Sequence, residues 1–271
     1  MNMQPRTFLA TLCLSFLSIL QPTYADNEFD NLRIITGFSM GYSEFSFPEK
    51  LDHNISFPSA NIPVGITFDN WQISLNLSTT LSKADIAEEE DVGQASRDDI
   101  DFTVGYRINS NWSIFTGYKY GKTKMQFSPR DFDEKENEGT DLELEFTNES
   151  YSQKGPFVGA SYSWQFEKAG RLSISLAYAY LEAIDNFAAN TDDEEEEEES
   201  VEFDDLSGQV KGDTKGFSYG LNWTMPLSSN LLFQTRFKVN KYQQDIVLGA
   251  ERFEDIDETF TSLHVGLAYV F

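Results

Sequence analysis

Cysteine is almost absent from this 271-residue chain, which contains only Cys13. Cys13 lies inside an apolar run, and it follows Leu12 rather than the small residue that precedes a lipoprotein acceptor cysteine. If the N-terminal segment is removed, the remaining protein has no thiol. The sequence therefore excludes disulfide bonds, thiolate catalysis and cysteine-based metal sites in that protein.

Basic side chains are also scarce, because 20 Lys and Arg residues face 45 Asp and Glu residues, for a net charge of −25. So large an acidic excess argues against nucleic acid, and against an anionic membrane surface, as a partner. Histidine occurs only twice, at His53 and His264. The choice of catalytic bases and metal ligands is correspondingly narrow.

Long hydrophobic runs are missing except near the N-terminus, where Thr7 to Leu20 is apolar. This run is shorter than the roughly 20 residues that a membrane-spanning helix needs. The preceding residues carry one positive charge, Arg6, and the run is followed by the small residues Thr23 and Ala25 at spacing typical of a cleavage site. We expect residues 1–25 to be a cleaved signal peptide and residues 26–271 to form one domain.

The rest of the chain shows alternation of apolar and polar residues instead of helical periodicity. Its mean hydropathy of −0.42 would ordinarily indicate a soluble protein. A membrane barrel, however, hides an apolar face in every second residue and averages out polar. The alternation occurs in ten segments: residues 34–42, 62–68, 71–77, 100–108, 112–120, 158–166, 172–180, 217–223, 231–239 and 263–271.

The connections between these segments alternate in length. Tight turns rich in turn-forming residues occupy 69–70, 109–111, 167–170 and 226–230. Long polar stretches occupy 47–60, 82–98, 123–154, 184–215 and 244–258. Short turns on one side and long loops on the other are typical of a transmembrane barrel whose short side is periplasmic.

The distribution of charge distinguishes a membrane barrel from a soluble β-sandwich or lipocalin-like barrel. In these segments the apolar phase holds no charged residue, and the other phase is dominated by Gly, Ser and Ala. The opposite phase also carries five charges, at Asp101, Arg107, Lys119, Arg236 and Lys238. Interfacial aromatic residues are expected in the apolar phase near the short turns, and there we find Trp71, Trp112, Trp164, Trp223 and Tyr269. A soluble barrel would have the reverse polarity.

The chain ends in Ala268-Tyr269-Val270-Phe271. This ending, in which Tyr269 and Phe271 are the aromatic residues, resembles the signal that Gram-negative outer-membrane β-barrel proteins present to their assembly machinery. The resemblance covers the mature chain without identifying a subfamily. It implies the cell outer membrane as location, and the lipid bilayer, lipopolysaccharide and the assembly machinery as partners.

We therefore predict an all-β fold: an antiparallel up-and-down transmembrane barrel of ten strands with five long acidic extracellular loops. Eight or twelve strands are the alternatives, because residues 141–147 and 200–206 also alternate. We interpret these two segments as hairpin extensions that stand above the membrane.

An enzyme has weak support. Ten-stranded barrels include the omptin proteases, whose sites resemble two acidic residues plus an Asp-His pair at the extracellular rim, and neither His53 nor His264 fits that pattern. Ser262 and His264 share one face of a strand, where Asp101 could orient the imidazole. A polar lumen residue is the simpler interpretation of His264, so we predict no catalytic residues, no enzyme and no cofactor.

The lumenal charges allow two interpretations. They either form a constriction that selects anions, or pair with one another in a closed barrel, because buried charges persist only when paired. The first gives a narrow, porin-like passive channel for small solutes, which we take as the predicted function. The alternative is a non-conducting structural or surface-binding barrel, resembling OmpX, that acts through its loops.

The acidic run Asp192 to Glu199, followed by Glu202, Asp204 and Asp205, is the most biased segment. Clustered oxygens suit divalent cations, which are therefore candidate partners of the loops. No loop has calcium-site spacing: Asp131 and Asp133 begin like one, but Lys135 and Glu136 do not continue it. A solvated, self-repelling loop is the preferred interpretation, and no metal site is predicted.

Overall fold

The computed structural model describes residues 32–46, 54–88, 91–129, 144–191, 206–248 and 251–271, and the structural statements below concern these residues. They form strands joined by short turns, and none of them forms a helix long and apolar enough to cross a membrane. The strands are β1 (Leu32–Ser46), β2 (Asn54–Phe68), β3 (Trp71–Thr80), β4 (Ala84–Glu88), β5 (Asp91–Arg107), β6 (Trp112–Pro129), β7 (Leu144–Phe166), β8 (Gly170–Thr191), β9 (Leu206–Pro226), β10 (Leu231–Leu248) and β11 (Glu251–Val270).

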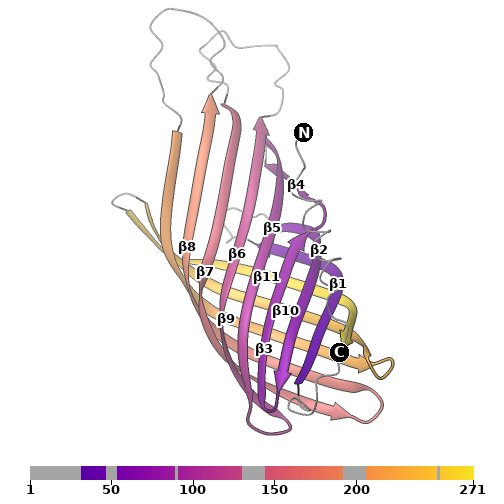
Figure 1. Ribbon diagram of the computed structural model, residues 1–271. Coiled ribbons are helices and arrows are strands. Elements are labelled where there is room, and N and C mark those ends of the chain that lie inside the picture. Colours follow the sequence, from indigo (N-terminus) through magenta and orange to yellow (C-terminus); the bar gives the residue numbers. More distant parts are fainter. Residues whose placement is uncertain (1–31, 47–53, 89–90, 130–143, 192–205, 249–250) are drawn as a thin grey trace, which may run out of the picture.

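These strands close into an antiparallel barrel (Figure 1). Apart from β3 and β4, which do not pair with each other, each strand pairs with its sequence neighbours; β1 pairs with β11, and β3 closes the ring against β5. β3 and β4 both pair with β5, one after the other along its length, so they occupy a single position in the wall. The predicted barrel of ten strands is confirmed.

The short connections are tight hairpins. Asp69 and Gly170 have positive φ values of 51° and 80°. Gly170 is required at its turn, because a Cβ there would lie 2.1 Å from the carbonyl oxygen of Thr224 and the backbone conformation suits glycine. These turns lie together at one end of the barrel.

The stretches predicted as long loops are largely strand, which corrects the prediction. β6, β7, β8 and β9 continue far beyond the alternating segments found in the sequence, and Figure 1 shows them rising well above the rest of the barrel. The extension of β7 begins at Leu144, within the alternating segment 141–147. Residues 141–143 and 200–205 lie outside the described residues.

A wide outward band is apolar. Its large side chains are 38% to 61% exposed in the isolated chain, which only a lipid environment makes favourable. On β6 the band runs from Trp112 to Tyr120, which at about 3.3 Å per residue and a tilt of roughly 40° spans about 20 Å. Members of this membrane band include Phe38, Met40, Val64, Ile66, Ile73, Phe102, Ile114, Val158, Ile174, Leu176, Leu221, Leu263, Val265 and Leu267.

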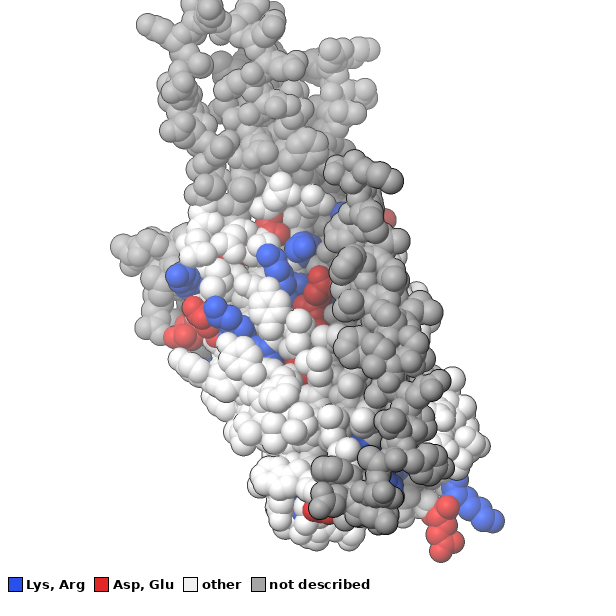
Figure 2. All heavy atoms as spheres, viewed as in Figure 1, with Lys and Arg blue, Asp and Glu red and all other residues white. Residues whose placement is uncertain are grey.

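Above the membrane band the polarity of the wall inverts. Glu44 and Asp98 now point outward and are exposed, whereas Phe45 and Ala95 point inward with no exposed surface. Figure 2 shows charged side chains gathered over this upper part of the visible face, above a largely uncharged surface. The inward side chains form an apolar layer across the lumen: Phe45, Ile55, Phe57, Ala84, Ala95, Met125, Tyr151, Ala183 and Phe260.

Candidate functional site

A polar cavity of about 270 Å³ lies inside the barrel below the apolar layer. Four of the five lumenal charges predicted from the sequence line it: Asp101, Lys119, Arg236 and Lys238. They come from three strands because β5, β6 and β10 each turn one face toward the lumen. Hydroxyl and amide groups, among them Ser59, Asn61, Asn76 and Ser262, complete the lining.

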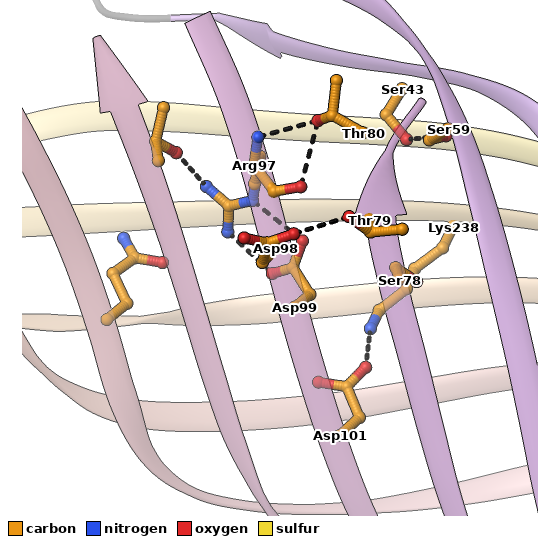
Figure 3. Close-up of polar contacts among 12 residues, drawn as sticks. Ser43, Ser59, Ser78, Thr79, Thr80, Arg97, Asp98, Asp99, Asp101 and Lys238 are labelled. Carbon is orange, nitrogen blue, oxygen red and sulfur yellow. Dashed lines mark hydrogen bonds and ion pairs between the residues drawn. The ribbon is translucent and has the colours of Figure 1, made fainter. Parts of the chain in front are cut away.

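An ion pair crosses this cavity. Lys238 on β10 donates a hydrogen bond of 2.7 Å to Asp101 Oδ2 on β5, as Figure 3 shows. Lys119 lies directly opposite Asp101 in the β5–β6 register. The side chain of Lys238 is 30% exposed and that of Asp101 is 18% exposed, so water reaches the pair. The two strands are thereby joined across the lumen, 137 residues apart in sequence.

Arg236 and His264 lie next to this ion pair but bond to neutral groups. Arg236 Nη1 donates to Asn61 Oδ1 at 3.1 Å and to Asn76 Oδ1 at 2.7 Å. His264 Nε2 is 2.9 Å from the Ser59 hydroxyl, which is 2.8 Å from that of Ser43. The arrangement considered from the sequence, with Ser262 and Asp101 on either side of His264, is not formed by these contacts.

A second ion pair, missed in the sequence, closes the top of the cavity. The guanidinium of Arg97 donates to both carboxylate oxygens of Asp99, at 2.9 and 3.0 Å, and to Thr123 at 3.0 Å (Figure 3). It also stacks over the rings of Phe45 and Phe260, at 5.2 and 4.6 Å from their centroids. The overlooked signal was the period-two pattern of Ala95, Arg97 and Asp99, which continues into a stretch interpreted as loop.

Glu258 forms the centre of a third polar group, inside the apolar layer. Its Oε2 accepts hydrogen bonds from Tyr151 at 3.0 Å, from Gln244 at 2.6 Å and from Gln153. Its neighbours on the outer face, Asp257 and Lys241, are exposed and charged, which places this level above the membrane. Burial raises the pKa of Glu258 despite the opposing charge of Arg97.

The remaining predicted residues lie elsewhere. Arg107 is not part of the cavity: it is exposed near the short turns, where its guanidinium donates to the Asp69 carbonyl at 2.6 Å. The predicted girdle residues point outward near the short-turn end, and their rings contact other aromatic residues such as Tyr106 and Tyr162. Those girdle residues are Trp71, Trp112, Trp164, Trp223 and Tyr269.

Several predictions fall outside the described residues, namely those on His53, on Asp131 and Asp133, and on the acidic run Asp192 to Glu199. Among the residues that are described, no three His, Asp or Glu side chains are grouped as metal ligands. The C-terminal aromatics are described: the rings of Tyr269 and Phe271 meet edge to face, and the Phe271 amide donates to the Ile34 carbonyl at 2.9 Å.

No protein-family model matches the chain, and no curated protein matches its sequence. Solved structures do match its fold. The outer membrane protease OmpT from Escherichia coli is 12% identical, with 93% of this chain and all of that chain covered and a TM-score of 0.51. The translocator domain of the autotransporter NalP from Neisseria meningitidis is 13% identical, with 97% and 95% covered and a TM-score of 0.46. At such identities the likeness concerns the fold alone.

The fold and the membrane band lead to one identification. A closed antiparallel barrel with an apolar outer band satisfies every backbone hydrogen bond in lipid without an exposed sheet edge. The fold matches that of the outer membrane protease OmpT over the whole length of that protein. The chain is a ten-stranded β-barrel protein of the Gram-negative outer membrane, of a subfamily that these likenesses do not identify.

Proposed function

We propose that this barrel is non-conducting and acts through the β-sheet that it raises above the outer leaflet. The apolar layer is the observation that carries the proposal. Phe45, Phe57 and Phe260, with Met125 and Tyr151, fill the lumen above the cavity and are 0% to 7% exposed. Ions need water along their whole path, and a tightly packed apolar layer excludes it.

The charges support the same proposal. Arg97 is paired with Asp99 and Lys238 with Asp101, so much of the lumenal charge is used in structural contacts. The porin-like channel expected from the sequence retains one supporting feature, the polar cavity beneath the layer. No catalytic role is proposed. The His264 imidazole is hydrogen-bonded to the Ser59 hydroxyl, and in the described part of the chain it has no hydrogen bond to a carboxylate.

Planar bilayers test this proposal. Purified wild-type protein should show no conductance steps, whereas Phe45→Ala combined with Phe260→Ala should show them, because two rings of the layer are removed. The matched control is Phe38→Ala with Phe237→Ala, which removes two outward rings from β1 and β10. Wild-type protein that conducts as well as the double variant would overturn the proposal.

The extended strands are the part proposed to meet a partner at the cell surface. Outside the barrel they carry mixed charge, including Lys154 paired with Glu182 at 3.4 Å and Lys215 paired with Asp245 at 3.9 Å. A protease site inserted at residue 195 should be cleaved on intact cells, and one at residue 110 should not. The opposite pattern would place the long strands in the periplasm.

We propose lipopolysaccharide as the immediate environment of these strands. Lys122, Lys154 and Lys215 follow closely above the outward tyrosines of the membrane band, at the level of the lipid phosphates. The assembly machinery remains the proposed partner of the C-terminal strand through Tyr269 and Phe271. Divalent cations at the acidic run remain a prediction, because that run is outside the described residues.

A further inference from the structure

The polar cavity carries more positive than negative charge. Four cations and two carboxylates line it. Arg97 pairs with Asp99 and Lys238 with Asp101. Within the described residues, no carboxylate lies within ion-pair distance of the other two cations, Lys119 and Arg236. The lining therefore carries two more positive than negative charges, in a protein whose net charge is −25.

Neither of these two cations has an anionic partner within ion-pair distance in the described residues. Lys119 is 3% exposed, and its ammonium lies over the rings of Tyr242 and Phe260, at 5.7 and 6.0 Å from their centroids. It has no hydrogen-bond acceptor in the part of the chain that the structure describes. Arg236 uses only Nη1, toward Asn61 and Asn76. Burying an unpaired charge is costly, so a compensating anion would be strongly favoured.

We propose that the cavity binds one small oxyanion through Lys119 and Arg236. Arginine presents its N–H groups as a fork that matches two oxygens of a phosphate, sulfate or carboxylate, and lysine adds a point charge. The volume of about 270 Å³ is just below the roughly 300–1,000 Å³ found for ligand pockets, so the ligand is small. Ser218 and Ser262 offer further hydroxyl donors on the same lining.

The cavity is closed toward the long strands by the apolar layer, in which Phe45 and Ala95 have no exposed surface. The site is distinct from the surface role proposed above, and it would persist if that role proved wrong.

Calorimetric titration of the refolded full barrel with inorganic phosphate at constant ionic strength tests the site. Wild-type protein should bind one phosphate, and phosphate should raise its urea midpoint by ligand linkage. Lys119→Met, which retains the contact with the two rings, should weaken binding on the order of tenfold, the loss expected for one charge-assisted hydrogen bond. Lys122→Met is the control, because Lys122 is three residues along the same strand on the outer face.

Parallel titrations with sulfate and succinate identify the chemistry of the ligand. Tighter binding of phosphate and sulfate than of succinate indicates a tetrahedral oxyanion, and the reverse order indicates a dicarboxylate. Arg236→Gln retains a donor for Asn61 and Asn76, so it provides a second variant if Lys119→Met does not fold. The inference is overturned if none of the three anions binds saturably, or if they bind the folded lumenal variants as tightly as wild type.

Discussion

Ser43 and Phe45 both point into the barrel from β1, two residues apart, yet they belong to different environments. Ser43 lines the polar cavity and bonds to the Ser59 hydroxyl at 2.8 Å, whereas Phe45 is fully buried in the apolar layer. The boundary between them coincides with the outward change from Tyr42 to Glu44, where the wall leaves the membrane. Below this level the barrel is apolar outside, and above it the barrel is packed like a soluble protein.

The apolar layer should contribute strongly to stability. Phe45→Ala leaves a void in a closely packed region, so it should lower the free energy of unfolding by about 3 to 5 kcal/mol. Phe38→Ala, on the outer face of the same strand, should cost less than half as much, because lipid fills the space. Urea titration of both variants in lipid vesicles measures the difference. Equal losses would mean that Phe45 is not in a packed interior.

The two faces of β8 should respond differently to charge. Leu176 lies in the membrane band, so Leu176→Arg should cost about 2 to 4 kcal/mol. Ser175 lines the polar cavity, whose lining carries a net positive charge, so Ser175→Glu should cost less than half of that. The same urea titrations provide the comparison. A larger loss for Ser175→Glu would show that the assignment of lipid and lumen faces is reversed.

Glu258 should make the barrel more stable as the pH falls through its raised pKa. Its pKa is raised in the folded state, so between the unfolded and folded pKa values the native protein binds more protons than the unfolded chain. In that window stability decreases as pH rises, and the loss is complete above the folded pKa. Glu258→Gln, which resembles the protonated acid, should therefore be less sensitive to pH than wild type.

The measurement is the urea midpoint between pH 5 and pH 8. The control is Glu44→Gln, which removes an exposed carboxylate at a similar level and should keep the wild-type dependence on pH. Other carboxylates contribute to the total, so the difference between the two variants is decisive. If both variants follow the same curve, Glu258 does not titrate as inferred.

How well the sequence predicts the position of a residue depends on whether that residue lies inside the membrane band or above it. Inside the membrane band, lipid imposes strict alternation, and segments such as 112–120 identified the ten strands and placed Asp101, Lys119, Arg236 and Lys238 in the lumen. Above the band, water on the outer face makes Lys122 and Lys124 as suitable as any apolar residue. The inward positions above the band still hold apolar residues such as Phe45, Met125 and Phe260. Polar residues occupy other inward positions there, so the alternation is harder to detect.

Pairing across the lumen is beyond such a pattern. Lys238 meets Asp101 only because β10 and β5 lie on opposite parts of a closed wall, which no local spacing encodes. The sequence did not predict the position of Arg97 for a related reason. Asp98 points outward and Asp99 inward, but the two adjacent acidic residues look like part of a loop. Such residues can be assigned to the interior only if the alternation is extended above the membrane band, where the outward positions become polar.

Cysteine labelling should reveal both the closed layer and the charge beneath it. A Cys13→Ser chain has no other cysteine, so single cysteines can be introduced without background. Ser175→Cys in the cavity should react with a sulfonate-bearing thiosulfonate reagent on the order of tenfold faster than with its trimethylammonium counterpart, because nearby cations concentrate anions. Lys119→Met should reduce this ratio.

Ala95→Cys, in the apolar layer with no exposed surface, should react with neither reagent in the folded protein. Rapid labelling at position 95 would show that water passes the layer, and a preference for the cationic reagent at position 175 would contradict the positive charge of the cavity.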